Sequence, residues 1–139
     1  MAITQALCTS FKGELFNKEH DMNTDTIKIA LFTSSATLSA ATTAYATTNE
    51  ISGTGYTAGG VTLTSASIGT SGTTYWVDFA DPSWTTSTFT ANGALIYNSS
   101  ASNKAVAVLA FGGDFTVTVG TFTITFPTAD ASNAIIRLA

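Results

Sequence analysis

One cysteine and one histidine, Cys8 and His20, are the residues best suited to nucleophilic chemistry. A thiol attacks a substrate as the thiolate, and a nearby imidazole is a common base for producing it. The sequence leaves open whether the two side chains meet. However, Cys8 falls beside the apolar stripe of an expected helix, and a free cysteine is usually a small buried hydrophobe. We therefore favour a structural role for Cys8 and expect no enzymatic activity.

Carboxylates are the second set of candidates, for metal binding or glycoside hydrolysis. Asp78 with Asp81, and Asp21 with Asp25, are close enough in sequence to share a cation, but neither pair has the EF-hand pattern. Asp81 precedes Pro82 and more simply starts a turn. The acids considered for paired-carboxylate hydrolysis are Glu50, Asp78, Asp81 and Asp114, and nothing in their spacing marks a pair. We expect no metal and no cofactor.

Aromatic side chains offer a third kind of chemistry, stacking on carbohydrate rings. The candidates are Tyr75, Trp76, Trp84 and Tyr97. In alternating strands, however, aromatic residues more often fill a core or an interface. Trp76 and Trp84 are therefore candidate partner contacts, and a glycan-binding host-attachment module is an alternative function.

The composition points towards assembly rather than catalysis. Only 10% of the 139 residues are charged, against roughly 25% in typical soluble domains, and threonine is the commonest residue. Such a surface has little of the charge repulsion that keeps monomers apart. With five basic residues and a net charge of −4, nucleic acid is not an expected partner. No apolar run approaches the roughly 20 residues that span a bilayer, so no membrane partner is expected either.

The N-terminal segment is expected to be helical. Ile3, Leu7, Phe11 and Leu15 recur at four-residue spacing, which predicts a helix over residues 3–17 with Thr4 as its N-cap. Residues 17–25 hold much of the charge and are expected to form an exposed connection. We expect the chain to be made in a cytoplasm, because its start lacks the pattern of a secretory signal.

After residue 25 the apolar period changes to two, which is typical of strands. Strands are expected in TIKIALFTS, VTLTSASI, TYWVDFAD, GALIYN, KAVAVLAF, FTVTV, TFTITF and AIIRLA. Turns are expected at Gly112, Gly113 and Asp114 and again around Gly120. In FTVTV, one buried face is expected to hold Phe115, Val117 and Val119. The fold class is therefore mostly β, an antiparallel β-sandwich or jelly-roll-like small barrel with an N-terminal α-helix.

The chain is expected to form one domain over residues 1–139. The helix and connection occupy residues 1–20, and the sandwich occupies residues 26–139 with a Thr/Ala/Gly-rich loop at about 34–60. Four apolar residues in this otherwise polar loop are candidate partner contacts: Leu38, Tyr45, Ile51 and Tyr56. The alternative is that they pin the loop to its own sandwich.

The chain resembles small β-rich structural proteins encoded by tailed bacteriophages. Four stretches carry the resemblance: ALCTSFKGELF, DTIKIALFTSSATLSAATTAYATTNEISGTGYTAGG, STFTANGALIYNSSASNKAVAVLAFGGD and GTFTITFPTADASNAIIRLA. The resemblance implies a virion component without enzymatic activity, most simply a head decoration or cement protein that stabilises the capsid. Its implied partners are the major capsid protein or other virion proteins, and a homo-oligomer, with a trimer favoured. A neck or tail protein is the alternative position in the virion.

Overall fold

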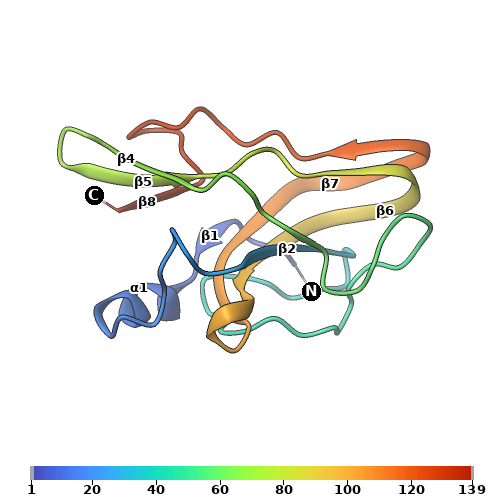
Figure 1. Ribbon diagram of the computed structural model, residues 1–139. Coiled ribbons are helices and arrows are strands. Elements are labelled where there is room, and N and C mark those ends of the chain that lie inside the picture. Colours follow the sequence, from blue (N-terminus) through green and yellow to red (C-terminus); the bar gives the residue numbers. More distant parts are fainter. Residues whose placement is uncertain (1, 139) are drawn as a thin grey trace.

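The computed structural model describes residues 2–138, which form two antiparallel β-sheets and a short N-terminal helix (Figure 1). The elements in chain order are β1 (Ala6–Leu7), α1 (Thr9–Phe16), β2 (Ile27–Phe32), β3 (Val61–Thr62), β4 (Ser67–Ser71), β5 (Thr74–Asp78), β6 (Ser83–Asn98), the 3-10 helix η1 (Ser99–Ala101), β7 (Lys104–Thr123) and β8 (Ile136–Leu138). The expected mostly-β class with an N-terminal helix is confirmed, in a sandwich-like arrangement. Neither sheet closes into a barrel within the described residues.

The larger sheet has the order β1-β7-β6-β2-β3 and holds most of the core. Strand β2 lies between β6 and β3, with Ile29 opposite Ile96 on one side and opposite Val61 on the other. Five of its six residues are buried, so both faces of this strand are covered. The alternation in TIKIALFTS therefore predicted the strand correctly. On the other face of the same strand, however, Ala30 and Phe32 are also buried in the core.

Strands β6 and β7 form a long hairpin that bends from one layer into the other. In Figure 1 both strands rise from η1 and curl over at the right of the view, so that residues 83–91 and 115–123 run through the upper layer. The bend coincides with a register shift between Ala91 and Gly93. Sandwiches commonly form corners in this way, by strands that switch sheets at a bulge.

The geometry of this hairpin corrects three sequence-based expectations. The triplet Gly112, Gly113 and Asp114 is not a hairpin turn but the corner of one continuous strand, and Asp114 Oδ1 accepts a hydrogen bond of 2.9 Å from Asn92 Nδ2 on β6. The irregularity around Gly120 is a bulge in the same strand. Phe115 and Val119 do not share a buried face, because the bulge and the open edge leave both exposed.

The helix begins later than the apolar spacing predicts. Residues 6–7 instead pair with β7, and Ile3 forms a parallel bridge with Leu38. Ile3 also fills the space above Gly93, where a side chain would lie 2.7 Å from its Cγ2 atom. Tertiary packing thus overrides helical periodicity at this end. The N-cap position is occupied by Cys8, without a side-chain cap, rather than by Thr4.

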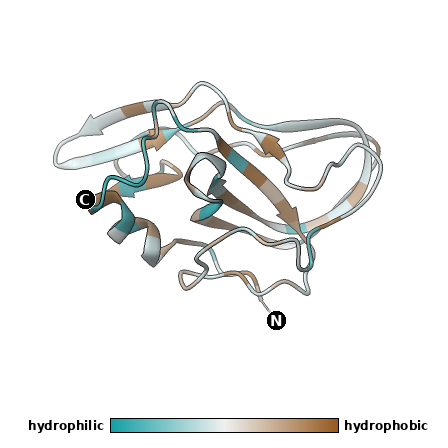
Figure 2. Cartoon of the chain, turned by 60° about the horizontal axis from the view of Figure 1, so that its bottom comes forward, coloured by the Kyte–Doolittle hydropathy of each residue, from teal (hydrophilic) through white to brown (hydrophobic). Residues whose placement is uncertain are grey.

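The smaller sheet has the order β4-β5-β8 and lies above α1 and β1 in Figure 1. The expected strand VTLTSASI splits into β3 and β4, and Ser65 in the connecting segment has a positive φ of 56°. Figure 2 shows long stretches of intermediate hydropathy with few strongly hydrophilic segments, which reflects the low charge of the chain.

Candidate functional site

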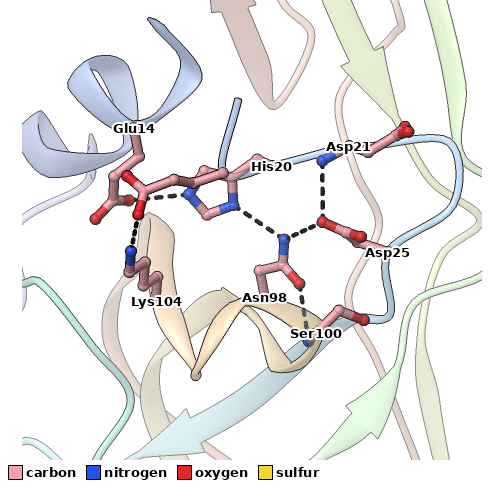
Figure 3. Close-up of polar contacts among 8 residues, drawn as sticks. Glu14, His20, Asp21, Asp25, Asn98, Ser100 and Lys104 are labelled. Atoms are coloured by element: carbon pink, nitrogen blue, oxygen red, sulfur yellow. Dashed lines mark hydrogen bonds and ion pairs between the residues drawn. The ribbon is translucent and has the colours of Figure 1, made fainter. Parts of the chain in front are cut away.

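A polar cluster surrounds the single histidine where α1, the following connection and η1 meet (Figure 3). His20 Nε2 lies 2.9 Å from Glu14 Oε1, and His20 Nδ1 lies 3.0 Å from Asn98 Nδ2. Because a carboxylate accepts and an amide nitrogen donates, these contacts assign the ring proton to Nε2. Asn98 Nδ2 also donates to Asp25 Oδ2 at 2.7 Å, and Asn98 Oδ1 accepts from the Ser100 amide. The cluster therefore joins three segments of the chain.

The arrangement does not activate Cys8. Both nitrogens of His20 are already engaged by Glu14 and Asn98. The thiol is fully buried, and burial, followed by the negative charge of Glu14, raises its pKa to about 11. A thiol with this pKa stays protonated at neutral pH and is a poor nucleophile. The Cys8–His20 pair left open by the sequence is not formed.

Several acidic residues accept hydrogen bonds from backbone amides. Asp81 Oδ1 accepts from the Phe126 amide at 2.9 Å, and Asp25 Oδ2 accepts from the Asp21 amide at 2.9 Å. The hydrogen bond from Asn98, more than any other contact, lowers the pKa of Asp25. Across residues 2–138, no group of three or more His, Cys, Asp or Glu side chains is placed to hold a metal ion. None of the helices described is long and apolar enough to cross a membrane.

A second polar cluster holds the loop over residues 34–60 in place. Glu50 accepts hydrogen bonds from Tyr45 Oη at 2.7 Å, Tyr56 Oη at 2.6 Å and the Gly59 amide at 2.7 Å. Tyr45 stacks on Tyr97 with ring centroids 4.5 Å apart, and Tyr97 Oη donates to the Gly59 carbonyl at 2.6 Å. Burial, followed by the hydrogen bond to Glu50, raises the pKa of both Tyr45 and Tyr56.

These contacts decide where most of the candidate partner residues lie. Leu38, Ile51 and Trp84 are buried in the hydrophobic core, while Tyr45 and Tyr56 are half-buried and bonded to Glu50. In this conformation Leu38, Ile51 and Trp84 are out of reach of a partner, and the loop residues pin the loop to its own sandwich. That was the alternative reading of the sequence. Trp84 also cannot stack on a sugar, because it packs against Phe89 and Phe122.

Trp76 is also half-buried, but it belongs to the smaller sheet and not to the loop. It lies on β5 opposite Gly69 of β4 and Arg137 of β8. Its indole covers Gly69 so closely that a Cβ there would lie 2.2 Å from the ring. One part of the ring is therefore used for packing within the sheet.

An exposed apolar surface lies at the end of the smaller sheet. Ile68, Tyr75 and Leu138 are exposed, and Tyr75 lies directly opposite Leu138 in the β5–β8 register. We call these three residues the β4-β5-β8 patch. The patch borders a hollow of about 420 Å³. The hollow lies between α1 with its connection and the smaller sheet. Its apolar lining is Phe11, Leu15, Met22, Ile68, Tyr75, Trp76, Val77, Ile136 and Leu138, and Lys18, His20 and Asp21 complete it.

Sequence reasoning found only part of this surface. The sequence pointed to Tyr75 and Trp76 as possible stacking residues, and both line the hollow, whereas it did not single out Ile68 and Leu138. The alternation in AIIRLA places Ile136 and Leu138 on one face of β8, so the pattern held a usable signal. The pairing of β8 with β5 is a long-range contact that no local pattern reveals.

Comparison of the chain with protein-family models, with curated proteins and with solved structures returned no significant match.

Proposed function

We propose that this protein is a structural component of a tailed-bacteriophage virion, a head decoration protein that binds the major capsid protein and has no catalytic role. The observation that carries the proposal is the β4-β5-β8 patch beside its apolar hollow. Exposed apolar groups rimming a concavity are typical of protein contact sites. The resemblance of the sequence to phage virion proteins supplies the identity of the partner.

The size of the patch favours a repeated, shallow contact. Fully burying a large apolar side chain contributes about 1.5–3 kcal/mol, and the three patch residues are already about half covered, with exposures of 42%, 59% and 42%. Burying the patch therefore contributes about 3 kcal/mol of binding free energy per copy. This is less than the roughly 4 kcal/mol that corresponds to a millimolar Kd. Many copies on a symmetric shell would hold by avidity. The scarcity of charge lowers the desolvation cost of each contact.

The proposal is tested by adding the purified protein to expanded heads that lack decoration. We expect the wild-type protein to co-sediment with the heads and to raise their melting temperature. Tyr75→Asp should abolish both effects, because it places a charge at the centre of the patch. Phe16→Asp is the matched control, since Phe16 is 93% exposed but does not line the hollow. If the wild-type protein binds purified tails and does not bind heads, the proposal is wrong and the protein belongs to the neck or tail.

A further inference from the structure

The outer part of β7, residues 115–123, has an unpaired edge. The neighbours of β7 are β6 and β1, and β1 reaches only Ala107 and Val108. Within residues 2–138, no backbone hydrogen bond joins residues 115–123 to any segment other than β6. In an antiparallel pair alternate backbone groups point away from the partner strand, so this edge offers free donors and acceptors. We call residues 115–123 the outer β7 edge.

The outer β7 edge also carries apolar side chains that stay largely exposed, although Phe115 touches Phe111 with ring centroids 6.1 Å apart. Phe115 is 53% exposed and Val119 is 79% exposed. Val119 has a φ of 44°, a left-handed backbone that a β-branched residue rarely adopts. Its bulge sets residues 118–119 against the single residue Thr88. The Val119 amide donates to Thr88 Oγ1 at 3.0 Å, but the side chain stays exposed on a strained backbone, and this combination points to a contact made with another molecule.

The electrostatics of this region favour a second copy of the chain as that molecule. The chain has a net charge of −4, so two copies repel each other in general. Residues 83–91 and 115–123, which make up the outer half of the hairpin, contain no charged residue. Two copies can therefore meet there without bringing acidic side chains together.

The sequence of the edge is complementary to itself. The bulge at residues 118–119 interrupts the regular strand, so we confine the pairing to residues 115–117: about a two-fold axis at Thr116, Phe115 faces the partner's Val117 and Thr116 faces the partner's Thr116. Aromatic–β-branched pairs and threonine pairs both stabilise antiparallel strands. Thr90 and Thr116 already form such a pair within the chain, with hydroxyls 2.8 Å apart.

A shallow hollow supplies the receiving half of the contact. It has a volume of about 260 Å³ and is lined by Phe111, Phe115, Phe122, Thr123, Ile124 and Thr125. A two-fold interface requires the projecting group and its receptor to lie on the same surface of each copy. Here the exposed side chain of Val119 is the projecting group and the hollow beside Phe115 is its receptor. Both lie on β7, so each copy carries both halves of the contact.

From these observations we propose that the protein forms a two-fold dimer through the outer β7 edge. The proposal goes beyond binding to a capsid, because it concerns the free protein and uses a surface separate from the β4-β5-β8 patch. An isologous contact of this kind produces dimers and not the trimer that the resemblance implies. Paired copies would also present two patches to a shell, which raises avidity.

Sedimentation equilibrium and native mass measurement on the full chain test the proposal. We expect a concentration-dependent dimer for the wild type. Val119→Gly should weaken dimerisation at least tenfold without lowering the thermal stability of the monomer, because glycine accepts the left-handed backbone. Phe115→Lys is a second variant, expected to leave the chain monomeric through charge repulsion. Phe16→Ser is the control and should dimerise as the wild type does.

Several results would overturn the proposal. They are a wild type that stays monomeric at its highest soluble concentration, a trimer, or a dimer that survives both Val119→Gly and Phe115→Lys. Tyr75→Asp should leave the dimer intact while it removes binding to heads. Failure of the dimer and failure of the proposed function are therefore separate results.

Discussion

The rings of Phe111 and Phe122 lie with centroids 6.0 Å apart although the two residues belong to the same strand, β7. A straight strand would separate them by about 36 Å. The contact therefore shows that β7 bends sharply at its corner, which brings the two ends of the bend together. Phe122 also packs on Phe89 and Trp84 of β6, so the corner is closed by a cluster of aromatic rings.

We predict that Phe111 and Phe122 are energetically coupled. Each change to Ala should cost about 1–3 kcal/mol, less than a fully buried Phe, because both residues are only partly buried. The double variant should show a coupling of about 0.5–1.5 kcal/mol. A double-mutant cycle by urea unfolding measures it. Strict additivity would mean that the two rings do not support each other across the corner.

Glu50 should control the order of the loop over residues 34–60. Glu50→Gln places an amide group where Tyr45, Tyr56 and the Gly59 amide all donate, so we expect a loss of about 1–2 kcal/mol. Hydrogen exchange at Gly59 should accelerate. Glu19→Gln, which removes only the partly exposed pair with Lys104, is the control and should leave loop exchange unchanged. Equal exchange in both variants would contradict the assigned role of Glu50.

Gly60 and Gly13 should respond in opposite directions to the same substitution. Gly60 has a φ of +77°, and a Cβ there would lie 1.7 Å from the Ile29 carbonyl oxygen. Gly60→Ala should therefore strongly destabilise the fold. Gly13 lies in α1 with open space around its Cα, so Gly13→Ala should stabilise by up to about 1 kcal/mol. Thermal unfolding compares the two variants, and a tolerated Gly60→Ala would show that the 34–60 loop does not pack on β2 as described.

Cys8 should resist thiol reagents in the folded protein. Its pKa of about 11 is raised above that of an unfolded cysteine, so the unfolded chain loses the proton first as the pH rises. The contribution of Cys8 to stability is thus complete below about pH 8.5 and declines as the pH approaches 11. Thiol titration with and without denaturant checks this. Phe16→Cys in a Cys8→Ser background should react at once, and comparable reactivity of native Cys8 would refute its burial.

Asp25 should contribute to the acid sensitivity of the fold. Its pKa is lowered in the folded state, chiefly by Asn98, so its contribution is complete above about pH 4 and is lost as the pH falls through the lower folded value. Asp25→Asn should lower stability at pH 7 and reduce the slope of stability below pH 4. Some slope should remain because the pKa of Asp130 is also lowered, by Asn133. An unchanged slope would show that the Asn98–Asp25 bond is not formed in solution.

The alternation of apolar and polar residues predicted the position of a strand well where one run of alternation corresponds to one strand of the structure. The alternation in TIKIALFTS and TYWVDFAD marked β2 and β5 correctly. It could not reveal that KAVAVLAF, FTVTV and the first half of TFTITF form the single strand β7. Gly112 and Gly113 favour a turn locally, and the corner exists only through pairing with β6. The helix started late for a related reason, since Ile3 packs on Gly93 far along the chain.

The candidate contact residues were harder to place from sequence. An apolar residue in a polar loop has the same sequence signature whether it faces a partner or its own core, and Leu38 and Ile51 face the core. The exposed residues that the sequence did not single out, Ile68 and Leu138, form a surface only when β4 and β8 pair with β5.

The central claim is that this chain works by adhesion on a phage head, and its position in an intact particle tests that claim most directly. A reconstruction of the virion should place the chain on the outer surface of the shell, with Tyr75 against the major capsid protein. Density for the chain at the tail alone, or its absence from the particle, would contradict the account.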